Sequence, residues 1–328
     1  MSDEILMAGL GTVGTSIALA LRQSKLAADL VGYDPDPKVS RASLKAQVVD
    51  RAIGDLRDFP SESDLCILSL APSEVIPSLE RLVPRLGEGA LVLGIGPVQS
   101  PIVAWCADHL PAGRAYVGAM LVEGASAFDA EIEPDPQHDR FAGGVMGLVL
   151  PSGTPQSGID VAVSLSRILG AHAFFLDPAE LDAGCAATEG LPLVLAAALM
   201  NMSSAQPGWR DARRLTGRTF ARATALLSDG DSESAAQSLV LSGTSLAAKL
   251  DALISELSEW RTSFGSGDEE ASLRLMADAS QAHSTWLSAR RKGDWELEET
   301  RVTPPVQGPG VLERMFGLGM RRGKKGRG

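Results

Sequence analysis

The chain has 328 residues, of which 45% are hydrophobic, and it carries a formal net charge of −11. This length and apolar content suffice for two globular domains with a sizeable core, and they exclude a disordered chain. The negative charge argues against nucleic acid as the main partner. No apolar run reaches the roughly 18–20 residues that cross a bilayer, since the longest covers only residues 191–202.

The cysteines and the start of the chain indicate a compartment. Cys66, Cys106 and Cys185 are widely spaced and lie in apolar stretches. This arrangement fits neither a metal site nor a disulfide framework, so we expect buried thiols in a reducing environment. The first residues run into an apolar segment without the basic region of a signal peptide. Together these features predict a cytoplasmic protein.

Strand and helix patterns alternate over residues 1–176. Short apolar runs predict strands at residues 5–8, 30–33, 64–70, 90–95, 115–117, 145–150 and 172–176. Helical stretches between them cover residues 12–23, 37–46, 73–86, 100–109 and 155–169. This alternation predicts βαβ units, so we expect an α/β fold on a doubly wound, mostly parallel sheet. Residues 129–144, which contain prolines and glycines, are expected to form a surface loop.

The first strand and helix enclose a complete G-x-G-x-x-G motif. It reads Gly9, Leu10, Gly11, Thr12, Val13 and Gly14. The first glycine permits a tight turn, the second lets a pyrophosphate approach the backbone, and the third lets helix and strand pack closely. The helix N-terminus then offers N–H groups to the phosphates. The motif predicts a Rossmann-type dinucleotide-binding domain, and a glycine-rich turn that binds nothing is the alternative.

An acidic residue follows the motif at the expected distance. Asp34 comes 20 residues after Gly14, at the end of the second apolar run. Its carboxylate would accept hydrogen bonds from the adenosine ribose hydroxyls and repel a 2′-phosphate. Residues 35–37 supply no arginine to hold such a phosphate. We therefore predict NAD rather than NADP as the cofactor.

No strand pattern returns after residue 176. Helical patterns cover residues 178–204, 209–227, 232–264, divisible near Gly243, and 268–290. Several of them are apolar on more than one face, as burial on two sides requires. We expect a cofactor-binding domain over residues 1–176 and an all-helical substrate and dimerisation domain over residues 177–298. Two copies are expected to form a homodimer through the helical domain.

Residues 299–328 form a basic tail. From Arg301 onward there are seven basic residues and one acid, which gives the tail +6 and leaves the body at −17. Its glycines and prolines predict disorder. The alternative is a weak contact with an anionic membrane surface, because apolar residues 311–312 and 315–316 precede the basic cluster.

Over about residues 3–295 the chain resembles the prephenate and arogenate dehydrogenases of tyrosine biosynthesis. The matching segments are residues 9–18, 31–34, 91–103 (D-x-G-S-V-K-x-P in the family), 178–192 (H-D-x(7)-H-L-P) and 208–215 (G-[FW]-R-D-x-T-R-[IL]). The resemblance implies oxidative decarboxylation of prephenate or arogenate, with hydride transfer to NAD, loss of carbon dioxide and formation of an aromatic ring. It also implies that Arg214 binds a substrate carboxylate.

The segments that carry catalysis in this family differ here. The resemblance assigns Ala119 to the position of the general-base histidine in an H-P-M-x-G segment. It assigns Pro97 to the supporting serine and Gly190 to a second histidine, while Gln99 and Leu181 replace a lysine and a further histidine. Alanine, proline and glycine side chains cannot transfer a proton. The catalytic residues are therefore left open, and we expect a changed or lost reaction.

Three functions stay open on this sequence. The first is an NAD-dependent dehydrogenase of the prephenate type, with the family substrate or a changed hydroxy acid. In an apolar cleft Glu123 or Glu189 could replace the missing base, although solvated carboxylates are the alternative. The second is a non-catalytic NAD-binding or regulatory protein on the same fold. The third is a hydroxy-acid dehydrogenase using Lys249, whose segment resembles the catalytic-lysine helix of hydroxyisobutyrate dehydrogenases.

Overall fold

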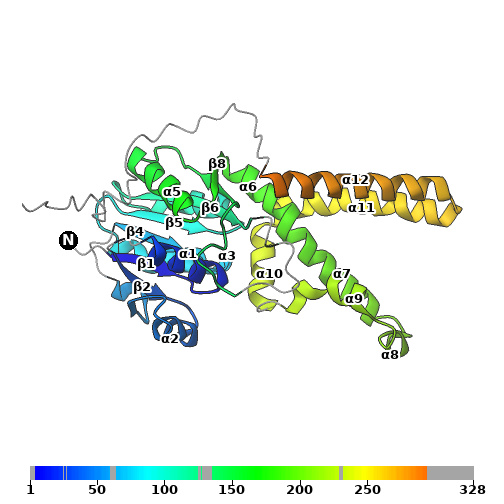
Figure 1. Ribbon diagram of the computed structural model, residues 1–328, viewed down its shortest axis with the longest axis horizontal. Helices are drawn as coiled ribbons and strands as arrows, with labels where there is room; N and C mark the ends of the chain where they lie inside the picture. Colours follow the sequence, from blue (N-terminus) through cyan, green and yellow to red (C-terminus); the bar gives the residue numbers. More distant parts are fainter. Residues whose placement is uncertain are drawn as a thin grey trace, which may run out of the picture.

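The computed structural model describes residues 4–24, 26, 28–59, 64–124, 127, 135–228 and 232–293. An α/β domain forms one end of the molecule, and helices project from it in two arms (Figure 1). One arm holds α7, α8 and α9, and the other is the hairpin of α11 and α12. The basic tail and residues 129–134 of the predicted surface loop lie outside the described residues, so the predictions made for them stay predictions. Residues 135–144 form turns without helix or strand, as predicted.

Eight strands form one sheet. They are β1 (Glu4–Ala8), β2 (Asp29–Tyr33), β3 (Arg51–Ala52), β4 (Leu65–Leu68), β5 (Leu91–Ile95), β6 (Ala115–Val122), β7 (Val145–Val149) and β8 (His172–Leu176). Their order is β3-β2-β1-β4-β5-β6-β7-β8, and the pairing is parallel except between β6 and β7. All seven predicted strands are confirmed. The two-residue β3 was missed because it is too short to show a pattern.

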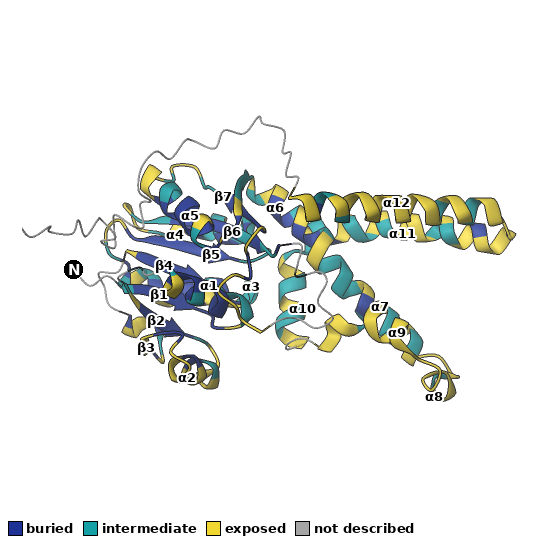
Figure 2. Ribbon diagram, in the orientation of Figure 1, coloured by how far each residue is buried: buried dark blue, intermediate teal, exposed yellow. Residues whose placement is uncertain are grey.

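Helices cover both faces of this sheet, which confirms the doubly wound prediction. They are α1 (Thr12–Gln23), α2 (Pro37–Lys45), α3 (Pro72–Leu82), α4 (Ser100–His109) and α5 (Gln156–Ile168), with short turns η1 (Leu56–Asp58) and η2 (Val83–Arg85). Ile17 of α1 and Leu165 of α5 pack in one buried cluster with Met7. Leu79 of α3 and Ile102 of α4 pack in a second cluster. The strands between these two layers are buried almost throughout (Figure 2).

The second half of the chain is helical in the residues that are described. Its elements are α6 (Pro178–Cys185), the π-helical turn η4 (Ala186–Gly190), α7 (Leu191–Ser204), α8 (Trp209–Ala212), α9 (Arg218–Ala223), η5 (Ala225–Ser228), α10 (Ser232–Leu241), α11 (Gly243–Ser266) and α12 (Glu269–Lys292). The division near Gly243 is confirmed. The single helix predicted over residues 209–227 is wrong, because the chain leaves the helix before Gly217, which has an extended backbone and begins α9.

The helix from Pro178 to Ser204 is apolar but poorly covered within one chain. The helix has 27 residues and, by length and composition alone, is long and apolar enough to cross a membrane. This corrects the sequence prediction that the longest apolar segment, residues 191–202, is too short to do so. Of α7, only Ala196 is buried, while Leu195 and Met202 are exposed. The predicted burial of this helix on two sides is therefore not provided by the described part of one chain.

Candidate functional site

The glycine motif forms the turn between β1 and α1, and two of its glycines have no room for a side chain. Gly9 has φ +90° and its N–H donates to the Tyr33 carbonyl at 2.8 Å. A Cβ on Gly9 would lie 2.0 Å from the Ser69 carbonyl oxygen, and a Cβ on Gly14 would lie 1.9 Å from the Gly9 oxygen. These contacts hold the turn against the end of β4, as the motif predicts.

Gly11 differs from its two neighbours in the motif. A Cβ there would have no atom within 4 Å, so the space over this residue is open. Gly11 also begins α1 without a side-chain cap, which leaves the first N–H groups of the helix available to an anion. An open backbone surface beside an uncapped helix N-terminus fits a dinucleotide pyrophosphate.

Asp34 is held beside this turn. One of its carboxylate oxygens accepts from the Leu10 N–H at 2.8 Å, and the other accepts from the Asp36 N–H at 2.9 Å. Each oxygen keeps a further lone pair, which a ribose hydroxyl could use. The carboxylate therefore has a fixed position at the end of β2, where the fold places the adenosine ribose of a dinucleotide.

A buried hydrogen-bond network lies behind the loop that follows β5. The Gln99 side chain donates to the Gly96 carbonyl at 3.0 Å and accepts from the Tyr116 hydroxyl at 2.8 Å. Burial holds the pKa of Tyr116 well above its usual value, so this hydroxyl stays protonated. Gln99 thus acts as a structural residue where the family resemblance implies a lysine.

Asp182 of α6 joins the helical region to the same loop. Its two carboxylate oxygens accept from the Gln99 N–H at 2.6 Å and from the Ser100 N–H at 2.9 Å. The carboxylate therefore caps the N-terminus of α4 from a position more than 80 residues away in sequence. This contact was not foreseen, although the acid itself stands in a segment that matches the family.

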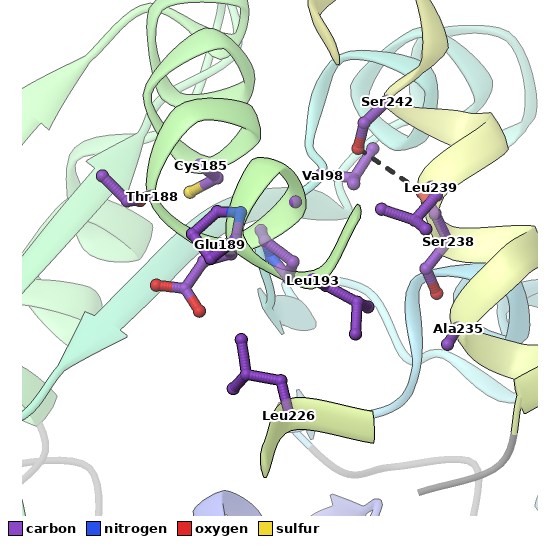
Figure 3. Close-up of a pocket in the computed structure, with 13 residues that line it drawn as sticks. Val98, Cys185, Thr188, Glu189, Leu193, Leu226, Ala235, Ser238, Leu239 and Ser242 are labelled. Carbon is purple, nitrogen blue, oxygen red and sulfur yellow. Dashed lines mark hydrogen bonds between the residues drawn. The ribbon is translucent and has the colours of Figure 1, made fainter. Parts of the chain in front are cut away.

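The loop after β5, the π turn η4 and helix α10 enclose a cavity of about 300 Å³, which we call the first cavity (Figure 3). Its lining is mostly apolar and consists of Pro97, Val98, Cys185, Thr188, Glu189, Gly190, Pro192, Leu193, Leu226, Ala235, Ser238, Leu239 and Ser242. Two positions singled out by the resemblance, Pro97 and Gly190, therefore meet in one cavity. Neither supplies a group that transfers protons.

A second cavity of about 540 Å³ lies between the sheet and α12. Its lining includes Met120, Val122, Val145, Gly147, Phe174, Leu176, Glu180, Leu181, Gly184, Trp286, Ala289 and Arg290. Cys185, Thr188 and Glu189 line both cavities. One face of the helix around η4 therefore forms part of the wall of both cavities.

The structure corrects the assignment of Ala119 to the site. Ala119 is fully buried and packs in the same core cluster as Val117 and Leu121. The alternation along β6 turns the next residue, Met120, toward α6, where it lines the second cavity. Methionine likewise offers no acid–base group.

Glu123, one of the two candidate bases, is engaged in an ion pair. It contacts Arg140, whose side chain is 4% exposed. The Glu123 carbonyl also accepts from the Arg290 guanidinium at 2.6 Å, so α12 is attached to the end of β6. Burial lowers the pKa of Arg290, and the nearby Glu123 opposes this shift. Nothing in the sequence pattern pointed to Arg290.

Glu189, the other candidate, lies between the two cavities. Surrounding protein raises the pKa of its carboxyl group, and the negative charge of Glu123 raises it further. The neighbouring Cys185 thiol is buried, which raises its pKa to about 12. At neutral pH the thiol is therefore protonated and is a poor proton acceptor.

Arg214 and Lys249 lie away from these cavities. Arg214 follows α8, its side chain is 71% exposed, and it lies 3.5 Å from Asp211. In Figure 1, α8 stands at the far end of its arm, remote from the sheet. Lys249 lies on α11 and lines neither cavity. A single chain therefore does not bring Arg214 to the candidate site.

Comparisons with known proteins agree with this architecture. Residues 17–131 match the family model described as the nucleotide-binding domain of prephenate dehydrogenase, which begins just after the glycine turn. Prephenate dehydrogenase of Bacillus subtilis (strain 168) is 23% identical over 204 residues, or 62% of this chain. The match covers 54% of that protein, so the chain spans about half the length of this curated relative.

Solved structures share the fold over most of the chain. Prephenate dehydrogenase from A. aeolicus, in complex with hydroxyphenyl propionate and NAD+, has a TM-score of 0.75 at 18% identity, covering 87% of this chain and 99% of that one. Synechocystis arogenate dehydrogenase has a TM-score of 0.66 at 22% identity, covering 86% of this chain and 99% of that one. Residues 17–131 thus resemble the nucleotide-binding domain of prephenate dehydrogenase, and the solved structures show that the rest of the chain shares the fold of these enzymes.

Proposed function

We propose that this protein is an NAD-dependent dehydrogenase that oxidises prephenate, arogenate or a related apolar hydroxy acid. One observation carries the proposal. The open glycine turn follows β1, and the loop that lines the first cavity follows β5. Because β1, β4 and β5 run parallel, both features lie at the same edge of the sheet, where dinucleotide-dependent enzymes bring cofactor and substrate together.

Separate groups of residues would bind the cofactor and the substrate. The turn at Gly11 and the N-terminus of α1 would hold the pyrophosphate, and Asp34 would hold the adenosine ribose. Bound NAD would supply the acceptor for a hydride. The apolar walls of the cavities would hold a carbocyclic substrate and exclude water. Arg290 is the cation among the described residues that line the second cavity, and its guanidinium would attract a substrate carboxylate.

A purified-protein assay tests this function. We expect the protein to form NADH when it is given NAD together with prephenate, arogenate or a related hydroxy acid, and the absorbance of NADH measures this reaction. Calorimetry measures NAD binding separately. Binding of NAD with no NADH from any of these substrates would contradict the proposal. That result would favour the second candidate, a non-catalytic NAD-binding protein. The observation that supports this candidate is the lack of proton-transferring groups at Pro97, Met120 and Gly190.

Replacing Asp34 with alanine is expected to weaken NAD binding by about tenfold or more, since hydrogen bonds to a charged group contribute about 1.5–3 kcal/mol. The same change removes the charge that repels a 2′-phosphate, so NADP should lose less affinity or gain some. Calorimetric titration with both nucleotides gives the ratio. Exposed Asp108 of α4, changed to alanine, is the control. An unchanged preference for NAD in D34A would show that another residue selects the cofactor.

We also propose that two chains form a homodimer through the helical region in the cytoplasm. Apolar side chains lie exposed along the α7 arm, among them Leu195, Met202 and Leu215, the last 88% exposed. A surface of this kind on a soluble protein indicates a partner. Such an assembly would also fix the position of Arg214, which stays a proposal for a substrate-binding residue.

A charge on this surface tests the dimer. Met202→Asp is expected to shift sedimentation at micromolar concentration from a dimer toward a monomer, because a buried unpaired charge opposes association. Glu80→Gln, at an exposed position of α3, should sediment as wild type. A monomeric wild-type protein would contradict the dimer, and sedimentation with anionic vesicles would instead support a membrane-surface contact.

A further inference from the structure

We infer that Glu189 is the proton acceptor of this site, taking the hydroxyl proton of the substrate as the substrate is oxidised. The inference rests on the proposed dehydrogenase function. It names a residue for acid–base catalysis, because the histidines that do this work in the family are absent from this chain. Its basis is the position of Glu189 between the two cavities and the engagement of the other carboxylates nearby.

The local backbone directs Glu189 to the site. It lies in the π-helical turn η4, which is followed by Leu191 and Pro192 at the start of α7. Single π turns inside α-helices occur often at functional sites. Thr188 and Glu189 of this turn and Cys185 just before it line both cavities, and Figure 3 shows the three side chains at the first of them. A substrate in either cavity would therefore meet the Glu189 side chain.

Other acidic groups around the site already have partners. Glu123 pairs with Arg140, and Glu180 accepts from the Asp177 N–H at 3.1 Å. Both oxygens of Asp182 accept from backbone N–H groups at the start of α4. The structure records no hydrogen bond or ion pair for Glu189 within the described residues. Glu189 is therefore the carboxylate that can turn to a substrate without breaking an existing contact.

Burial and a neighbouring negative charge raise the pKa of the Glu189 carboxyl group above its usual value. Burial has the larger effect, and the negative charge of Glu123, which directly follows β6, raises the pKa further. Arg290, on α12, lines the second cavity and is itself held by the Glu123 carbonyl. Cys185 is neutral, because burial raises its pKa to about 12. A raised carboxyl pKa brings the group closer to the operating pH, where acid–base transfer is most efficient.

In the proposed reaction Glu189 would accept one proton from the substrate and later return it. The O–H bond of the substrate breaks and its proton passes to the Glu189 carboxylate. Bound NAD would accept the hydride from the carbon that bears this hydroxyl group, and a C=O bond would form at that carbon. Where a ring carboxylate then leaves as carbon dioxide, the electron pair of the broken C–C bond passes through the ring to that oxygen. The oxygen takes the proton back from Glu189 and becomes a phenol, so Glu189 ends the cycle ionised.

Replacement of Glu189 by glutamine tests this role. We expect kcat/KM to fall by about 100-fold to 10,000-fold, the usual contribution of general acid–base catalysis. NAD affinity and thermal stability should match wild type, since no hydrogen bond or ion pair joins the lost carboxylate to another of the described residues. Glu189→Asp should retain part of the activity. Glu80→Gln, which removes an exposed carboxylate from α3, should retain all of it.

The pH dependence gives a second readout. Below its raised pKa, Glu189 is protonated and cannot accept a proton, so kcat/KM of wild type should fall on acidification at a higher pH than an ordinary carboxylate would cause. E189Q should lack this limb. A third readout needs no turnover. In protein labelled with ¹³C at the glutamate carboxyl, the resonance that is missing from E189Q should titrate above the usual glutamate range.

The outcomes separate the two proposals. A wild-type enzyme that binds NAD but makes no NADH overturns the proposed function and this inference with it. An active wild type with an equally active E189Q overturns the inference alone. A Glu189 resonance that titrates in the ordinary range also overturns it. An E189Q protein that fails to fold leaves Glu189→Asp and the wild-type pH profile to decide.

Discussion

Replacing Gly11 with valine is expected to abolish useful NAD binding while leaving the fold intact. The backbone of Gly11 is extended, with φ −67° and ψ −170°, and a Cβ there would meet no atom within 4 Å. A branched side chain would occupy the open space that a pyrophosphate needs. We expect the dissociation constant for NAD to rise by about 100-fold, or roughly 2.7 kcal/mol, in calorimetric titration.

The matched variant is Gly14→Ala. Its added methyl group would lie 1.9 Å from the Gly9 carbonyl oxygen, so α1 would have to move away from the turn. Overpacking of this kind costs about 1–3 kcal/mol or more, and G14A should therefore lose stability as well as NAD binding. If G11V bound NAD as wild type does, or if it unfolded as readily as G14A, the assignment of this turn would be wrong.

Replacing Asp182 with alanine is expected to lower the free energy of unfolding by about 3 kcal/mol, because a hydrogen bond to a charged group contributes about 1.5–3 kcal/mol and two are lost. The loss leaves the buried Gln99 N–H and the Ser100 N–H without an acceptor. Denaturant titration measures the change. Asp182→Asn should fall between wild type and D182A, since its amide offers one acceptor oxygen instead of two.

The same substitution should disturb the site. Asp182 fixes α6 to the segment after β5, and both line the first cavity through Cys185 and Pro97. Activity of D182A should therefore fall even at temperatures where the protein remains folded. Asp108→Ala, at an exposed position of the same helix α4, is the control and should leave stability within about 0.5 kcal/mol of wild type. A similarly small change in the free energy of unfolding of D182A would show that the hydrogen bonds of Asp182 do not stabilise the protein.

The sequence allowed most of the α/β domain to be predicted. The strands around Met7, Ile67 and Leu93 are nearly continuous apolar runs, as a parallel sheet covered on both faces requires. The glycine motif could be interpreted because each glycine answers a local steric demand. The break at residues 213–217 could not be predicted, since the segment before Gly217 keeps a helical pattern and its ends are set by tertiary packing.

The site was less predictable, because it depends on contacts between distant segments. Ala119 and Met120 are adjacent in sequence, and only the register of β6 decides which of them reaches the cavity. The contact of Arg290 with Glu123 joins residues 167 positions apart. No periodicity or motif reports such a contact. Glu189 was a candidate from its place beside Gly190, and only the structure shows that it makes no hydrogen bond or ion pair among the described residues.

A crystal structure of the protein with NAD bound would test the assignment of the cofactor and substrate sites. We expect the pyrophosphate over Gly11, the adenosine ribose on Asp34 and the nicotinamide at the mouth of the first cavity. In this arrangement the Glu189 carboxyl group should face a substrate bound at nicotinamide C4, within reach of a hydrogen bond to the substrate hydroxyl. A nicotinamide that points away from both cavities, or a turn at residues 9–14 that stays empty at saturating NAD, would contradict this assignment.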